Sequence, residues 1–345
     1  MDINNLETFK GLITKFDLND RDQLKVSSIY KFFEEATGFT SSLLNKKLDF
    51  NFEEKLQIDY PNLKYQEYQT VYILTDLKRQ KDNIQFINKL YLTTSDNNSK
   101  DLVISLNKNT IKSVKLEHFS INKPEINTDI FSAFKGLVKK EDCDQMSHMN
   151  VQYYFGKHSD AIKILFNKIS SQSLDNLTYR IVNERCIFSK EVGLDCALEV
   201  VLNIKNIYED HLILLSKVYC IDNKNVSAYF ETNISFKIDK KVKKIINKIF
   251  STKTPTYLNE LQFNDLRQLT ENRPSSKPSK IAFISCKKAV NTWDLDHELM
   301  GSNQFKIGCV SDAATHLFTY CGADYNWRTE YNIGSAALDL SLIHI

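Results

Sequence analysis

The chain has 345 residues, more than one ordinary hydrophobic core accommodates, which predicts two or three domains. Its 45 Lys and Arg nearly balance its 43 Asp and Glu, so no basic field favours nucleic acid as an obligatory partner. There is no signal segment, no apolar run of the roughly 18 residues that span a bilayer, and no Cys-x-x-Cys pair among the seven cysteines. We therefore expect a cytoplasmic globular protein without a membrane span, a disulfide framework or a metal site.

The first predicted domain covers residues 1–118. Its apolar residues recur at helical spacing within a helix over about Lys25–Leu44. β-forming residues and alternation then predict strands over Tyr68–Leu74, around Ile84, Phe86 and Leu90, and over Leu102–Leu106, with a turn at Asp96–Lys100.

A linker over 119–132 leads to a second domain over 133–239, in which the same order is clearer. An apolar run, Phe134–Val138, leads into a polar turn and a long helix that extends to about Phe166. Alternation and turn residues then predict antiparallel strands over Leu198–Ile204, His211–Ile221 and Ala228–Phe236. A largely apolar helix followed by such a meander predicts an α+β domain in which a curled sheet encloses the helix.

A second linker, 240–280, contains a short helix pattern (Val242–Ile249) and the Pro- and Ser-rich stretch Arg273–Lys280. The third domain, 281–345, begins with a strand over Ile281–Cys286 and a helix, but is too short to include the covering sheet. We therefore expect the apolar residues of this helix to face water. They are Ile307, Val310, Ala314 and Leu317. We interpret the chain as a fragment, and its last six residues, Leu340–Ile345, as a translated sequencing-adapter end.

The three domains are predicted to be copies of one another. Placing 142–166 over 294–318 without a gap gives nine identities in 25 positions, among them Asp142/Asp294, Asp144/Asp296, Gly156/Gly308 and Asp160/Asp312. A fainter copy lies 125 residues upstream of the second, because Phe9–Leu12 repeats as Phe134–Leu137.

The stretch from Asp144 to Tyr154 resembles the Asp-x-x-Gly-His-x-Asn-Asn-x-x-Tyr signature of hotdog-fold acyl thioesterases of the 4-hydroxybenzoyl-CoA thioesterase type. Ser147 replaces the usual Gly, and Val151 replaces the second Asn. The resemblance implies tandem hotdog domains, a role in lipid metabolism and hydrolysis of an acyl-CoA or acyl carrier protein thioester without a cofactor. It covers most of residues 7–238, and its specific part is 142–154.

The same resemblance implies the catalytic residues. Asp144 would act as base or nucleophile, and its alternative role is a helix N-cap. His148 and Asn150 would orient the carboxylate or water and bond the thioester oxygen; the alternative is that they satisfy their own turn. Val151, Gln152 and Tyr154 are expected to contact substrate.

The other copies lack this set. The first has Asn19 and Gln23 where the second has Asp144 and His148, and the third has Met300 and Ser302 in place of His148 and Asn150. We expect both to be inactive, with the first copy pairing with the second inside the chain; a homo-oligomer remains open.

We assign Asp142 a structural role, and His158 a place in the core or an interface. The alternative function is a catalytically silent hotdog module that binds acyl thioesters or mediates assembly. A hotdog dehydratase or hydratase is a third reading, but the His-rich loop of those enzymes is missing.

Overall fold

The computed structural model describes residues 3–44, 55–58, 67–80, 83–93, 102–112, 130–144, 146–173, 177–250, 295, 301–322, 325–330 and 339–343. The predicted turn Asp96–Lys100, the stretch Arg273–Lys280 and the strand Ile281–Cys286 lie outside these residues, as does Asp296. No helix within the described ranges is both long enough and apolar enough to cross a membrane.

Two units have the same order of elements. The first unit consists of β1 (Ile3–Leu12), η1 (Lys15–Asp17), α1 (Val26–Leu43), β2 (Lys55–Ile58), β3 (Thr70–Gln80), β4 (Asn83–Leu92) and β5 (Leu102–Lys112). The second consists of β6 (Phe131–Leu137), η2 (Lys140–Asp142), α2 (Val151–Ser173), β7 (Arg180–Phe188), β8 (Ala197–Ile207), β9 (His211–Cys220) and β10 (Asn225–Ser235). The remaining elements are α3 (Lys240–Ile249), α5 (Asn303–Tyr320), α6 (Tyr325–Glu330) and β11 (Asp339–Ile343).

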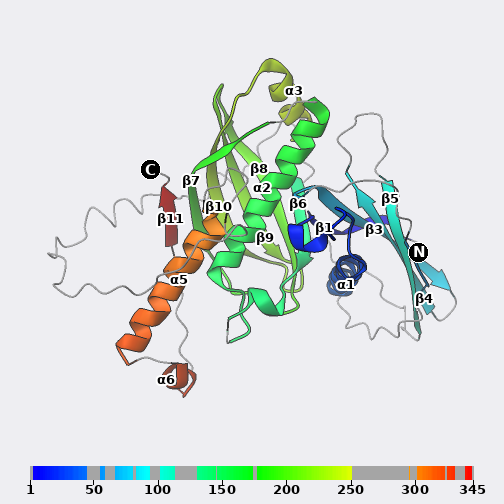
Figure 1. Ribbon diagram of the computed structural model, residues 1–345, viewed down its shortest axis with the longest axis horizontal. Helices are drawn as coiled ribbons and strands as arrows, with labels where there is room; N and C mark the ends of the chain where they lie inside the picture. The colour runs from blue at the N-terminus through cyan, green and yellow to red at the C-terminus, as the bar shows by residue number, and fades with distance from the viewer. Residues whose placement is uncertain are drawn as a thin grey trace.

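The described strands form one antiparallel sheet in the order β11-β7-β10-β9-β8-β6-β1-β3-β4-β5-β2 (Figure 1). Each unit therefore repeats one arrangement, in which the strand after the helix lies at the edge farthest from the strand before it. The predicted helices are confirmed, although α2 continues seven residues past its predicted end at Phe166. Most predicted strands are confirmed within two to four residues, but β3 and β5 extend well beyond the predicted ends, and β1, β2, β7 and β11 were not predicted.

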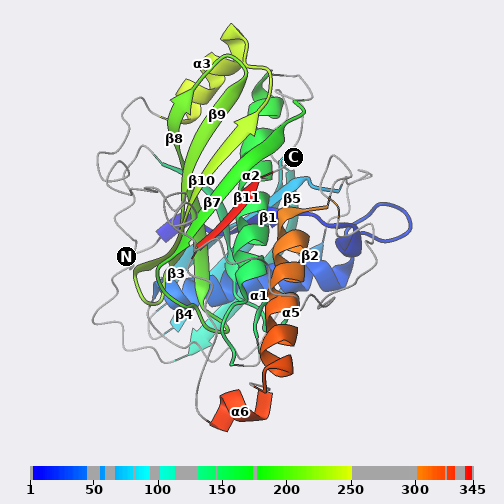
Figure 2. The ribbon, with the colours of Figure 1, turned by 90° about the vertical axis from the view of Figure 1, so that its left-hand side faces the viewer.

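Each sheet half curls around its own helix, as predicted (Figures 1 and 2). In the first unit, Phe32, Phe33 and Ala36 of α1 pack in one apolar cluster with residues of β3 and β4. In the second unit, Phe155 and Leu165 of α2 are fully buried among side chains of β7–β10. Apolar burial on one side of each helix is the main stabilising contribution to this arrangement.

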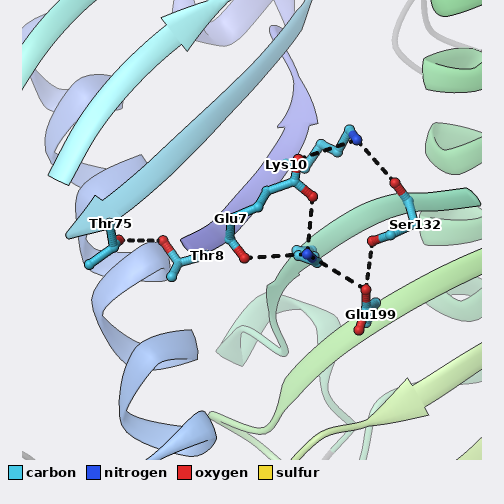
Figure 3. A network of polar contacts seen from close by, with 7 residues as sticks. Glu7, Thr8, Lys10, Thr75, Ser132 and Glu199 are labelled. Carbon is cyan, nitrogen blue, oxygen red and sulfur yellow. Dashed lines mark hydrogen bonds and ion pairs between the residues drawn. The ribbon is translucent and has the colours of Figure 1, made fainter. Parts of the chain in front are cut away.

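The two units join where β1 meets β6, and charged side chains line this seam (Figure 3). Lys10 lies opposite Lys135, its counterpart in the repeat. The Glu7 carboxylate lies 3.0 Å from Lys135 Nζ and 3.4 Å from Lys10 Nζ. Glu199 lies 3.6 Å from Lys135 Nζ and accepts a 2.6 Å hydrogen bond from Ser132 Oγ. A single registered pair of residues, Lys10 and Lys135, thus joins the two halves of the sheet at the seam. A network of charged side chains links the two strands further.

The third segment packs against the opposite side of the second unit. Helix α5 runs beside α2, and β11 pairs with β7 (Figure 2). Residues 340–343, which we interpreted as an adapter end, belong to β11. Our expectation for the α5 face is confirmed for Val310 and Leu317, which are 51% and 46% exposed, but is wrong for Ile307, which is buried in the core of the second unit.

Candidate active site

The motif loop comprises residues 142–150, and its described residues, 142–144 and 146–150, form a tight turn closed by their own hydrogen bonds. Asp144 Oδ1 accepts from the backbone N–H of Met146 at 2.9 Å and of His148 at 3.1 Å. The Asp144 N–H donates to the His148 carbonyl at 2.8 Å. Asp144 is exposed, and the described residues donate to its Oδ1 but not to Oδ2. Its carboxylate therefore bonds amides of the turn rather than amides of α2.

The first unit builds the same loop with an amide in place of the carboxylate. Asn19 Oδ1 accepts from the N–H of Arg21 and of Gln23, each at 2.9 Å. The Asn19 N–H donates to the Gln23 carbonyl at 2.8 Å, as Asp144 does to His148. The turn therefore has no need of a charge at this position.

The left-handed residue of the loop is also shared. Ser147 has φ 62° and its counterpart Asp22 has φ 56°. This conformation favours glycine, which explains why the family signature carries Gly where this chain has Ser147. In the third segment the bridge between Leu295 and Gly301 matches that between Cys143 and Met149. All three copies thus show elements of one loop.

A neighbouring segment, residues 189–196, holds the motif loop in place. The Met149 N–H donates to the Val192 carbonyl at 2.8 Å, and the Leu194 N–H donates to the Ser147 carbonyl at 3.0 Å. His148 Nδ1 lies 3.4 Å from the exposed carboxylate of Glu191, and the imidazole is 38% exposed. The predicted catalytic imidazole therefore faces solvent beside Glu191, an acid that no pattern in the sequence singles out.

Asn150 caps the start of α2. Its Oδ1 accepts from the Gln152 N–H at 3.3 Å, and its carbonyl accepts from the Tyr153 N–H at 2.9 Å. The N-cap role that we considered for Asp144 is thus filled by Asn150. This geometry matches the alternative in which Asn150 satisfies its own turn.

The three expected substrate contacts lie in different environments. Val151 is half-buried against the core. The Gln152 side chain lies over Gly308 of α5, so that a Cβ there would collide with its amide, and Gln304 lies over Gly156 in the same way. Tyr154 is 4% exposed; burial raises the pKa of its phenol.

Charged side chains gather below the motif loop where the first two units meet. Asp142 is buried, accepts from the Lys139 N–H at 3.1 Å and lies 3.1 Å from Lys157 Nζ. Lys139 Nζ lies 2.6 Å from Glu35 of α1. Burial raises the pKa of Asp160 to about 6, against the opposing effect of Lys157 and Lys139.

Sequence reasoning overlooked Glu35 and Asp160 as members of a charged cluster. They occupy equivalent positions in the first two copies, and Asp312 fills the third. An acid at the same helical position in every copy was the available signal.

His158 lies in the core, as predicted, within a buried polar chain. Its Nδ1 is 2.6 Å from Glu184 Oε1 and its Nε2 is 2.9 Å from Ser216 Oγ. Asn303 of α5 donates to Glu184 Oε2 at 2.6 Å. The order serine, imidazole, carboxylate resembles a catalytic triad, but Ser216 is only 2% exposed and so cannot meet a substrate from solvent. The series of hydrogen bonds also continues from Glu184 to Asn303. It serves to attach α5 to the second unit.

No family model and no curated protein match the sequence. Among solved structures, an acyl-CoA hydrolase from Agrobacterium tumefaciens is similar with a TM-score of 0.51 and 8% identity over 69% of this chain and 97% of that chain. A Staphylococcus aureus protein in complex with CoA matches at TM-score 0.32 and 15% identity, covering 38% of this chain and 91% of its own. A Thermus thermophilus thioesterase with coenzyme A and Zn matches at TM-score 0.31 and 12% identity, covering 36% and 98%. With the duplicated strand order, the first of these similarities shows that the chain is built from tandem hotdog units.

Proposed function

We propose that the protein hydrolyses acyl thioesters of CoA or of acyl carrier protein. Water adds to the thioester carbonyl, the carbon–sulfur bond breaks, and a carboxylic acid and a thiol are released. The reaction takes place at the motif loop of the second unit, with no redox step.

The observation that carries this proposal is the comparison of Asp144 with Asn19. Both side chains make the same two hydrogen bonds through Oδ1, so the turn itself is satisfied by an amide. Asp144 adds a negative charge and a second oxygen that the turn does not use. An exposed carboxylate oxygen in the turn that precedes a helix suits a base that activates water or a nucleophile that attacks the carbonyl.

The start of α2 supplies the complementary positive field. A helix N-terminus is the positive end of the helix dipole, and we assign the Val151 N–H and this field to the developing oxyanion. His148 orients the attacking water from the exposed side of the loop. The first unit supports the loop from below, because Glu35 reaches across to Lys139.

The test is release of free thiol from a panel of acyl-CoA and acyl carrier protein thioesters by the full chain and by Asp144→Asn. Because Asn19 already builds the same turn, the variant should keep its secondary structure and melting temperature. Its kcat should fall by about 10²–10⁴-fold, the usual contribution of a general base. The matched control is Asn19→Asp, which introduces the same change of charge in the first unit and should leave turnover unchanged.

Undiminished turnover by Asp144→Asn would remove this residue from the mechanism. Absence of turnover on every thioester would favour the second candidate, a silent module for assembly. The reciprocal packing of Gln152 on Gly308 and Gln304 on Gly156 is the observation that supports that candidate, because it commits the expected substrate-contact face of α2 to another helix.

A further inference from the structure

Two cysteines and an aspartate converge behind the motif loop. The Sγ atoms of Cys196 and Cys220 and a carboxylate oxygen of Asp222 all lie within 4.8 Å of one another. Cys220 is buried, Cys196 is half-buried and Asp222 is exposed, so the group extends from the core to the surface. It is the one group of three such side chains with this spacing in the described part of the chain.

Contacts with the backbone position all three residues. Cys220 ends β9 and is registered opposite Leu198 of β8. The Cys196 carbonyl accepts from the Val138 N–H at 2.9 Å. Asp222 Oδ2 accepts from the Ala197 N–H at 2.7 Å, which orients the carboxylate as an outer hydrogen bond orients a metal ligand.

We propose that Cys196, Cys220 and Asp222 bind a thiophilic divalent cation of the zinc class. Tetrahedral zinc places its ligands at about 2.0–2.3 Å, so the ligand atoms lie roughly 3.5–4 Å from one another. The three ligand atoms here lie within 4.8 Å of one another, and small side-chain movements would bring them to that spacing. Two sulfur ligands favour zinc over magnesium or calcium, which prefer oxygen. Binding releases the two thiol protons to solvent, and water takes the fourth position on the exposed side.

Such an ion would stabilise the segment that holds the motif loop. Residues 189–196 bond the motif loop through the Val192 carbonyl and the Leu194 N–H, and the segment ends at Cys196. An ion joining Cys196 to the end of β9 would therefore fix the C-terminal end of this segment. The Cys-x-Asp pair at 220–222 lies 24 residues from Cys196, and for this reason the local spacing rules for zinc sites did not identify it.

The experiment is titration of the reduced full chain with Co²⁺, followed by displacement with Zn²⁺. The wild-type protein should bind one Co²⁺ and show a thiolate-to-cobalt charge-transfer band that Zn²⁺ abolishes. Because even outer partners of a metal contribute 10–100-fold to affinity, Cys196→Ser and Cys220→Ser should each weaken binding by at least about 100-fold. The control Cys321→Ser removes an exposed cysteine outside the group and should bind as wild type does.

The Asp222→Asn variant distinguishes a site with three protein ligands from a site formed by the two thiols alone. The variant should keep the charge-transfer band, because both thiols remain, but should show altered visible absorption and bind Co²⁺ more weakly than the wild type. Zn²⁺ should also raise the melting temperature of the wild type and of Cys321→Ser but not that of Cys196→Ser, and this readout remains if Cys220→Ser fails to fold. Absence of the band in the reduced wild type, or an unchanged band in Cys196→Ser, would overturn the proposal. None of these measurements depends on thioester turnover.

Discussion

The seam between the first two units can be tested by Glu7→Gln. Glu7 is the carboxylate that the described residues place against both Lys10 and Lys135, at 3.4 Å and 3.0 Å. The substitution keeps the size of the side chain but removes its charge. Lys10, whose side chain is 16% exposed, then loses its one described ion pair, while Lys135 keeps Glu199.

The expected loss of unfolding free energy follows from burial. Removing one member of a fully buried ion pair costs about 3–5 kcal/mol. The Glu7 side chain is 26% exposed, so solvent screens part of the interaction and we expect about 1.5–3 kcal/mol. With a single registered backbone pair between β1 and β6, this loss should also separate the unfolding of the first unit from that of the second.

The dependence on pH gives a second measurement. Burial alone would raise the pKa of Glu7, but the ammonium groups of Lys10 and Lys135 outweigh burial and hold the pKa below the ordinary value of 4.5. Since the folded pKa is the lower one, the stabilisation is fully present above about pH 4.5 and is lost as the pH falls through the folded value. The difference between wild type and variant should shrink in acid.

The assay is urea unfolding of the wild type, Glu7→Gln and Glu34→Gln at about pH 7 and below about pH 4. Glu34 is an exposed glutamate of the same unit and serves as the control. Equal free energies for the two variants at neutral pH would refute the role of the network. So would a difference from wild type that does not change with pH.

Three other substitutions test the second unit and its contact with α5. Asp160→Asn should stabilise the protein by about 1–3 kcal/mol near pH 8 and be neutral near pH 4, because burial raises the folded pKa to about 6 and the cost of the charged form appears as the pH rises above 3.8. Gly308→Ala should stabilise α5 by less than the about 1 kcal/mol that Ala gains over Gly within a helix, since the new methyl group displaces the Gln152 amide, and thermal unfolding should show a larger gain in a Gln152→Ala background. Asn303→Ala should cost about 1–3 kcal/mol and speed proteolysis of α5, because it leaves Glu184 Oε2 buried without its donor.

The sequence predicts the fold well where a pattern is local. Helical spacing in Lys25–Leu44 and alternation in Leu198–Ile204 correspond to α1 and β8. Strand β7 was missed because Glu184 interrupts its apolar pattern, and that carboxylate is buried because His158 and Asn303 each bond one of its oxygens at 2.6 Å. A partner 26 residues distant is invisible to a local pattern.

The place of the motif loop in the fold was predictable from the sequence, but the contacts of its side chains were not. The sequence located the loop before α2, and the structure shows that loop closed on itself. It could not show that Asn150 rather than Asp144 caps the helix, because both residue types are common caps. The contact of Gln152 with Gly308 depends on how α5 crosses α2, which no motif within either helix specifies.

The repeats show how little the frame of the motif loop depends on the residue at the position of Asp144. The loop is built mainly from backbone hydrogen bonds and from side-chain oxygens that accept from backbone N–H groups. Asp17 and Asp142 each accept from the residue three positions earlier, at 2.9 Å and 3.1 Å. Any residue with a suitable oxygen preserves this frame, so Asn19 and Asp144 are interchangeable for folding. The charge at that position is therefore free to vary between copies without loss of the fold. Selection for a reaction, rather than for folding, would act on the negative charge of Asp144 in the second unit.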